Sequence, residues 1–162
     1  MWLRKIVKHD WRYLLFLMLS HHPPERLHRT ICLGFRGKKV YLCARCTGSY
    51  SSLTAVLVAY FIGLRFPLWL YLPLISVLPI AAAVDWLTQS CKFRESRNSI
   101  RVGTGLLLGI AEAYFLLLVI SGMVDMFLVA MSIIGLYAIS IYIVALKTKC
   151  LDSYLNDIMR GH

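Results

Sequence analysis

Four long stretches with almost no charged residues limit what this chain can fold into. A helix needs about 20 apolar residues to cross the roughly 30 Å hydrocarbon layer of a bilayer, and these stretches reach or approach that length. The hydrophobic fraction of 59% and the charged fraction of 16% also lie outside the range of soluble domains. We therefore predict an all-α polytopic membrane protein with four transmembrane helices, at Tyr50–Leu64, Pro67–Val84, Val102–Val124 and Met126–Leu146.

The lysines and arginines between these stretches predict the orientation of the chain. Of the 18 such residues, all but Arg65 fall in alternate segments. The positive-inside rule places those segments in the cytoplasm, so the protein is expected in the cell membrane with both termini inside. Its partners are then the lipid bilayer and anionic lipid headgroups. Since orientation also accounts for the net charge of +10, nucleic acid is not an expected partner.

Three regions follow from this topology. Residues 1–46 are predicted to form an N-terminal cytoplasmic or interfacial segment, residues 47–146 the four-helix transmembrane domain, and residues 147–162 a cytoplasmic tail. Within the first region, residues 13–20 are apolar but too short to cross the bilayer. We predict that they form a short interfacial helix, with a tilted or re-entrant element as the alternative.

A cysteine motif, Cys43-Ala44-Arg45-Cys46, precedes the first predicted span. This spacing lets two sulfur atoms bind one tetrahedral metal ion or close a redox disulfide. The reducing cytosol favours metal ligation or thiols over a structural disulfide, and zinc or iron would suit such a site. Small residues at a helix start are the alternative without chemistry. The candidate ligands are His21, His22, Cys32, Cys43 and Cys46.

The loop between the second and third predicted spans carries a second motif. If the second span stays helical, Asp85 and Gln89 share a face; if the third starts early, Arg94, Arg97 and Arg101 share one. Such arginines bind phosphate or carboxylate in bidentate fashion, oriented by Asp85 and Glu95. The arginines could equally serve topology alone. The candidate ligand-binding residues are Arg45, Gln89, Arg94, Arg97, Asn98 and Arg101, and the catalytic candidates are Asp85, Glu95 and Glu112.

Glu112 is the one charge within the third predicted span. A carboxylate there costs a few kcal/mol unless it is protonated or paired, so it is a functional candidate. It lies beside a ridge of small residues, Gly105, Gly109 and Ala113, that suits close helix packing. A protonated glutamate bonded across a helix interface is therefore an equally good structural account.

These motifs resemble those of a prokaryotic family of predicted multi-pass membrane proteins of unknown function. The resemblance covers roughly residues 20 to 110 and rests on Cys43-Ala44-Arg45-Cys46-Thr47-Gly48, Asp85-x-x-Thr88-Gln89 and Arg94-Glu95-Ser96-x-Asn98-x-x-Arg101. The family pattern begins with Cys-His-Gln, where this chain has Ser20-His21-His22. The resemblance implies that the motifs on the two predicted cytoplasmic segments belong together, and it implies no activity.

The leading functional hypothesis is a polar site at the cytoplasmic face, built from both segments, that binds a metal ion, a phosphorylated lipid headgroup or both. If the site is catalytic, a metal would activate water and the arginines would neutralise phosphate. The alternative is a non-enzymatic subunit or assembly factor of a membrane complex, or a homo-oligomer with such a role. A third hypothesis is a small transporter that uses Glu112.

Overall fold

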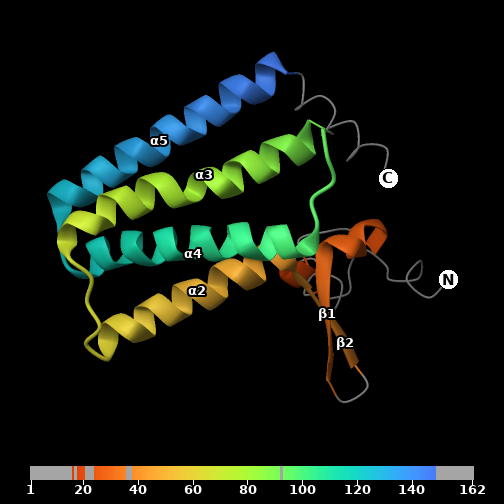
Figure 1. Ribbon diagram of the computed structural model, residues 1–162, viewed down its shortest axis with the longest axis horizontal. Coiled ribbons are helices and arrows are strands. Elements are labelled where there is room, and N and C mark those ends of the chain that lie inside the picture. The colour runs from red at the N-terminus through yellow and green to blue at the C-terminus, as the bar shows by residue number, and fades with distance from the viewer. Residues whose placement is uncertain (1–15, 17, 21–23, 36–37, 92, 149–162) are drawn as a thin grey trace.

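The computed structural model describes Phe16 and residues 18–20, 24–35, 38–91 and 93–148. The elements are the 3-10 helix η2 (Pro24–Arg29), strands β1 (Thr30–Phe35) and β2 (Lys38–Cys43), α2 (Ala44–Phe61), the 3-10 helix η3 (Leu68–Leu70), α3 (Tyr71–Ser90), α4 (Asn98–Ile120) and α5 (Val124–Lys147). Figure 1 shows α4 between α2 and α3, and a small hairpin at the end of the bundle where α2 begins.

Three helical segments are long and apolar enough to cross a membrane, namely Leu68–Ser90, Asn98–Ile120 and Val124–Lys147. Within the part of the chain that the structure describes, α2 does not qualify, because its first half carries several serines and threonines. The structure is thus mostly helical, with helices long and apolar enough for three of the four predicted spans. The first predicted span, Tyr50–Leu64, and the orientation of the chain stay predictions.

The hairpin corrects the all-α prediction. Strands β1 and β2 pair antiparallel, with Thr30 opposite Cys43 and Phe35 opposite Lys38. Both strands contain β-branched or aromatic residues, which favour extended structure. Two such runs separated only by Arg36-Gly37 indicate a hairpin. The distribution of charges, on which the all-α prediction rests, does not indicate it.

The helix boundaries also differ from the charge-free stretches. Helix α3 continues past Val84 to Ser90, and α4 begins at Asn98 and ends at Ile120. Helix α4 ends there because Gly122 follows with a φ of 66°, a conformation that favours glycine. Helix α2 begins at Ala44, well before the predicted Tyr50.

The small-residue ridge on α4 packs against α2, as its spacing predicts. A Cβ atom added at Gly105 would collide with the carbonyl oxygen of Arg45, and one added at Gly109 would collide with that of Ser49. Ala113, the third member, is fully buried. The glycines therefore bring the backbones of α2 and α4 close together, and this contact holds Arg45 beside the start of α4.

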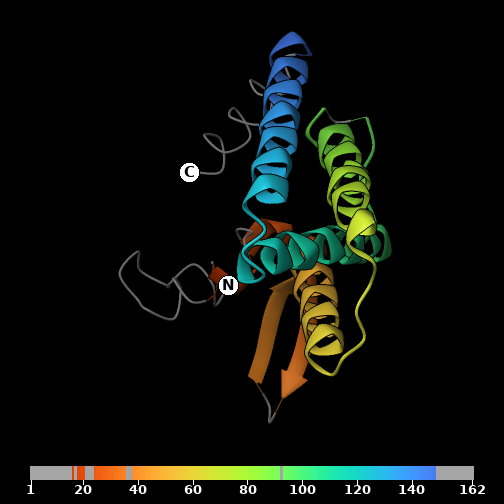
Figure 2. The same cartoon turned by 90° about the vertical axis from the view of Figure 1, so that its left-hand side faces the viewer.

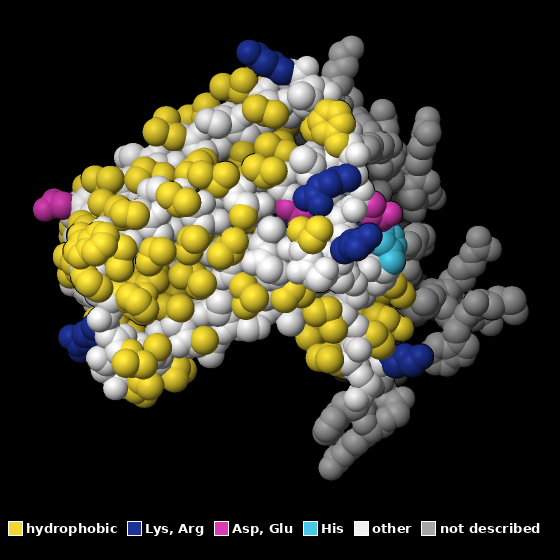
Figure 3. All heavy atoms as spheres, viewed as in Figure 1, with side chains coloured by type: hydrophobic (Ala, Val, Ile, Leu, Met, Phe, Trp, Pro, Cys, Tyr) yellow, Lys and Arg dark blue, Asp and Glu magenta, His cyan; other side chains and the backbone are white. Residues whose placement is uncertain are grey.

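The apolar core lies at the opposite end of the bundle from the hairpin. Tyr71 on α3 packs against Tyr114 on α4, with ring centroids 4.7 Å apart, and Leu117 and Leu118 are almost fully buried beside them. Helix α5 is the least buried of the three candidate spans. Figure 2 shows α3 and α5 on one side of α4, with α2 and the hairpin on the other, and Figure 3 shows hydrophobic side chains covering the visible face of the helices, with lysines and arginines mainly at the hairpin end.

The predicted interfacial helix and the cytoplasmic tail fall largely outside the described residues. Of residues 13–20, the structure describes Phe16 and residues 18–20, which are helical. The Phe16 ring packs edge-on against Tyr41 of β2, with centroids 6.1 Å apart. Whether this segment lies in the membrane interface stays a prediction.

Candidate functional site

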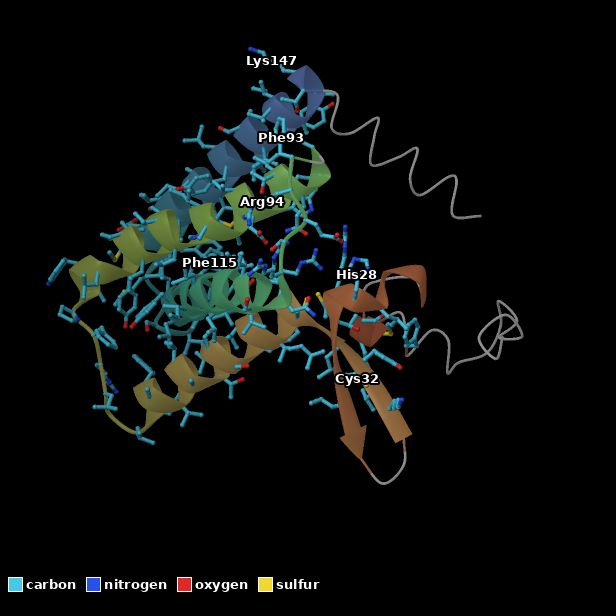
Figure 4. The ribbon with its side chains drawn as sticks, turned by 45° about the vertical axis from the view of Figure 1, so that its right-hand side comes forward. His28, Cys32, Phe93, Arg94, Phe115 and Lys147 are labelled. Carbon is cyan, nitrogen blue, oxygen red and sulfur yellow. The ribbon has the colours of Figure 1, made fainter. Side chains whose placement is uncertain are left out.

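A buried carboxylate near the end of α3 gathers side chains from three segments. Asp85 is 1% exposed. Its Oδ2 accepts hydrogen bonds from Arg45 Nη2 at the start of α2 and from Gln89 Nε2 at 2.8 Å, and its Oδ1 accepts one from Arg94 Nη2 at 3.0 Å. Figure 4 shows Arg94 beside the end of α3. Because α3 stays helical to Ser90, Asp85 and Gln89 share a face, as the sequence predicts.

Gln89 extends this network to α4. Its Nε2 binds Asp85, and its Oε1 accepts a hydrogen bond from Nη2 of Arg101. Arg101 is 3% exposed and lies in the first turn of α4. The face predicted for Arg94, Arg97 and Arg101 does not form, because α4 begins only at Asn98. We call the five connected residues the Asp85 cluster: Arg45, Asp85, Gln89, Arg94 and Arg101.

The Asp85 cluster holds more donors and more positive charge than it can satisfy internally. Arg45 and Arg94 both bond the carboxylate of Asp85, and a third guanidinium group, that of Arg101, bonds the neighbouring Gln89. Within the described ranges, the Nε atoms of Arg45 and Arg101 are buried and have no hydrogen-bond partner. Buried polar groups in native proteins are nearly always hydrogen-bonded, so two unmatched N–H donors need an explanation. An anion at this position would supply both acceptors and charge.

Glu95 and Asn98 contact the hairpin segment and not Asp85. His28 Nε2 lies 2.7 Å from Glu95 Oε1 in an exposed pair, and Figure 4 shows His28 at the start of the hairpin. The Nδ2 of Asn98 donates to the carbonyl oxygens of His28 and Thr30, at 2.9 and 3.2 Å. These residues therefore fasten the loop before α4 to the start of β1. Arg97, which precedes α4, is exposed and lies outside the cluster.

The cysteine motif forms a pair of hydrogen-bonded thiols at the junction of β2 and α2. Cys43 is buried and bonds the side chain of Cys46, whereas Cys32 on β1 is exposed. No three His, Cys, Asp or Glu side chains among the described residues are placed to hold one metal ion. His21 and His22 lie outside those residues. The hypothesis of zinc or iron therefore gains no support from the geometry.

Glu112 lies at the interface between α4 and α2. Its Oε2 accepts a hydrogen bond of 2.5 Å from Ser49 Oγ. One turn further along α2, Ser52 Oγ donates a hydrogen bond of 2.7 Å to the carbonyl oxygen of Leu106. A bonded carboxyl at a helix interface is the arrangement that the structural account of Glu112 predicts.

Two pairings at this site are not predictable from the sequence. Arg45 and Asp85 are both candidate residues, and the predicted topology places them at the same membrane face, but nothing in the sequence joins them as a pair. The contact between His28 and Glu95 has no sequence signal either. Both pairings depend on how α2, the hairpin and α3 pack around α4, which no local pattern encodes.

The fold and the cluster define a class: a small helical membrane protein with an arginine-rich polar site where its helices meet the hairpin. A family described as "Predicted membrane protein (DUF2085)" matches residues 21–115. The chain belongs to this family, as the motif resemblance indicated, and the matched stretch includes the whole Asp85 cluster.

Two relatives are similar to the chain. An uncharacterized protein of Methanothermobacter thermautotrophicus is 36% identical over 99 residues, which cover 60% of this chain and 84% of that protein. The uncharacterized protein MJ1492 of Methanocaldococcus jannaschii is 31% identical over 110 residues, which cover 65% of each. The chain thus spans less than two thirds of the second relative. No solved structure matches.

Proposed function

We propose that the Asp85 cluster binds the phosphorylated headgroup of a membrane lipid at the cytoplasmic face. The observation that supports this function is the surplus of buried donors, since Arg45 and Arg101 each carry an Nε without a partner in the described part of the chain. The planar guanidinium group binds phosphate oxygens in bidentate fashion. The cluster would therefore present a preformed site that accepts a phosphate without first breaking the contacts to Asp85.

The position of the cluster supports a lipid as the source of the phosphate. Asp85 lies in the segment Leu68–Ser90 and Arg101 in the segment Asn98–Ile120, both long and apolar enough to span a membrane. Each residue is near the end of its segment, which is the depth of lipid headgroups. The positive-inside rule assigns this end to the cytoplasmic leaflet, where anionic lipids are concentrated.

Binding of phosphatidic acid by the purified full chain in detergent tests this function. Dioleoyl phosphatidic acid is titrated against dioleoylglycerol, which has the same chains but no phosphate, and complexes are counted by native mass spectrometry. We expect phosphatidic acid to bind and dioleoylglycerol not to bind. Arg101→Gln should weaken the affinity for phosphatidic acid about tenfold or more, because a hydrogen bond to a charged group contributes about 1.5–3 kcal/mol.

Two further variants complete this experiment. Arg94→Gln changes a half-exposed member of the cluster, so it should fold normally and still weaken binding. Lys147→Gln is the matched control, because it removes one exposed positive charge from the end of α5 without touching the cluster. Equal binding of the two lipids, or equal loss in all three variants, would contradict the proposal.

A second function is favoured by the fact that Asp85 joins α2, α3 and the loop before α4. In this account the cluster is a clamp that holds the helix ends together, and the protein is a non-enzymatic subunit or assembly factor of a membrane complex. Asp85→Asn separates the two functions. A clamp alone predicts less folded protein on gel filtration and no binding of phosphatidic acid by the unmodified chain, whereas a headgroup site predicts binding that changes in the Asp85→Asn protein that does fold.

A further inference from the structure

A cavity of about 670 Å³ adjoins the Asp85 cluster, between the long helices. Its lining residues come from α2, α3, α4 and α5, and most are apolar, such as Leu53, Ile75, Leu108 and Ile134. A volume of this size is typical of pockets that bury a small-molecule ligand. Since three of these helices are candidate spans, the cavity lies at the depth of lipid tails.

Arg45 belongs both to the cavity and to the cluster. Its side chain lines the cavity, while its Nη2 donates to Asp85 Oδ2. The polar site and the apolar space therefore meet at Arg45. A ligand that fills both must have an anionic group at one end and hydrocarbon next to it.

We propose that the cavity receives the hydrocarbon tail of the lipid whose phosphate binds the Asp85 cluster. The ligand is thus a phosphorylated long-chain lipid in one defined pose, with its phosphate at Arg45 and Arg101 and its tail toward Ile75 and Ile134. This inference rests on the proposed headgroup function, and it adds the hydrocarbon tail of the lipid as a second determinant of affinity.

The polar side chains of the cavity do not require a polar ligand. Glu112 lines the cavity, and its carboxyl already accepts the hydrogen bond from Ser49. Tyr137, another lining residue, donates its hydroxyl to the carbonyl oxygen of Ser76. Apart from Arg45 and Tyr50, the other lining residues are apolar, and an apolar cavity takes up hydrocarbon in preference to water.

The dependence of affinity on the length of the lipid tail tests the inference. Native mass spectrometry of the full-length protein compares the binding of dioleoyl phosphatidic acid, dihexanoyl phosphatidic acid and inorganic phosphate. Ala83→Phe on α3 narrows the cavity, whereas Ala81→Phe is the matched control, because Ala83 lines the cavity and Ala81 does not. Gel filtration confirms that both variants fold.

We expect the dioleoyl lipid to bind at least tenfold more tightly than the dihexanoyl lipid. Ala83→Phe should remove that difference and leave the dihexanoyl affinity unchanged, while Ala81→Phe should keep it. Equal affinities for both chain lengths, still weakened by Arg94→Gln, would overturn the tail site and leave the headgroup function standing. Failure of every phosphate compound to bind would overturn the headgroup function itself.

Discussion

The two ends of the helix bundle are built from different interactions. Where Tyr71 meets Tyr114, α3 and α4 are joined by aromatic and aliphatic side chains with almost no exposed surface. Where Asp85 meets Arg45 and Gln89 meets Arg101, α3 is joined to α2 and to α4 through charged and polar groups whose donors outnumber the acceptors. Among the described residues, the buried side-chain atoms without a hydrogen-bond partner all belong to the polar end. Stability and binding should therefore respond differently to substitutions at the two ends.

Asp85→Ala at the polar end should have the largest effect. It leaves the guanidinium groups of Arg45 and Arg94 without their carboxylate, and we expect the free energy of unfolding to fall by about 3 kcal/mol, since removing one partner of a buried ion pair is strongly destabilising. Unfolding of the purified protein in mixed micelles with increasing sodium dodecyl sulfate measures this.

Glu95→Ala is the control for that measurement. Its partner His28 is half-exposed, so the loss should be below about 1 kcal/mol. If both substitutions destabilise the protein equally, burial of Asp85 is not what sets the polar end apart.

Leu118→Ala at the apolar end should have the next largest effect. Leu118 is fully buried, and the space left by its side chain should lower the free energy of unfolding by about 2 kcal/mol. Leu136→Ala, at a 65% exposed residue on α5, is the control and should have little effect. Phosphatidic acid binding should survive in both; its loss in Leu118→Ala would mean that the two ends are not independent.

The hydrogen bond between Ser49 and Glu112 lies between the two ends. Its removal should have the smallest effect on the free energy of unfolding. A double-mutant cycle of Ser49→Ala and Glu112→Ala should give a coupling free energy of about 0.6 kcal/mol, the average for polar pairs between membrane helices. The same unfolding assay measures it. A coupling near zero would remove the structural account of Glu112 and favour the transporter hypothesis.

The spans could be predicted from charge because lipid excludes charged groups, but the helix ends could not. Asp85 ends the charge-free stretch that predicts the second span, yet α3 continues to Ser90. Its charge is satisfied by Arg45 and Arg94 rather than by water, so the helix has no reason to stop there. A charge-free stretch therefore marks where a helix faces lipid, and its end is set by separate signals such as Gly122.

Which residues form the candidate site was predictable in part, because the charge pattern predicts which segments lie at the same membrane face. Topology placed the cysteine motif and the Asp85 loop at one face, and the structure brings Arg45, Asp85, Gln89, Arg94 and Arg101 together there. The pairing within this set was not predictable. It depends on the close approach of α2 to α4 at glycine positions, which fixes where the Arg45 side chain starts.

The different burial of α2 and α5 has a consequence for assembly of the protein. In its candidate span, α5 is apolar and only 6% buried, so it is suited to enter a bilayer as an independent helix and dock afterwards. Helix α2 carries Ser49 and Ser52, whose hydroxyls bond acceptors on α4. Packing of α2 is thus coupled to the presence of α4, a helix made later in synthesis. The bundle should form around the pair α2–α4, with the last helix added at its side.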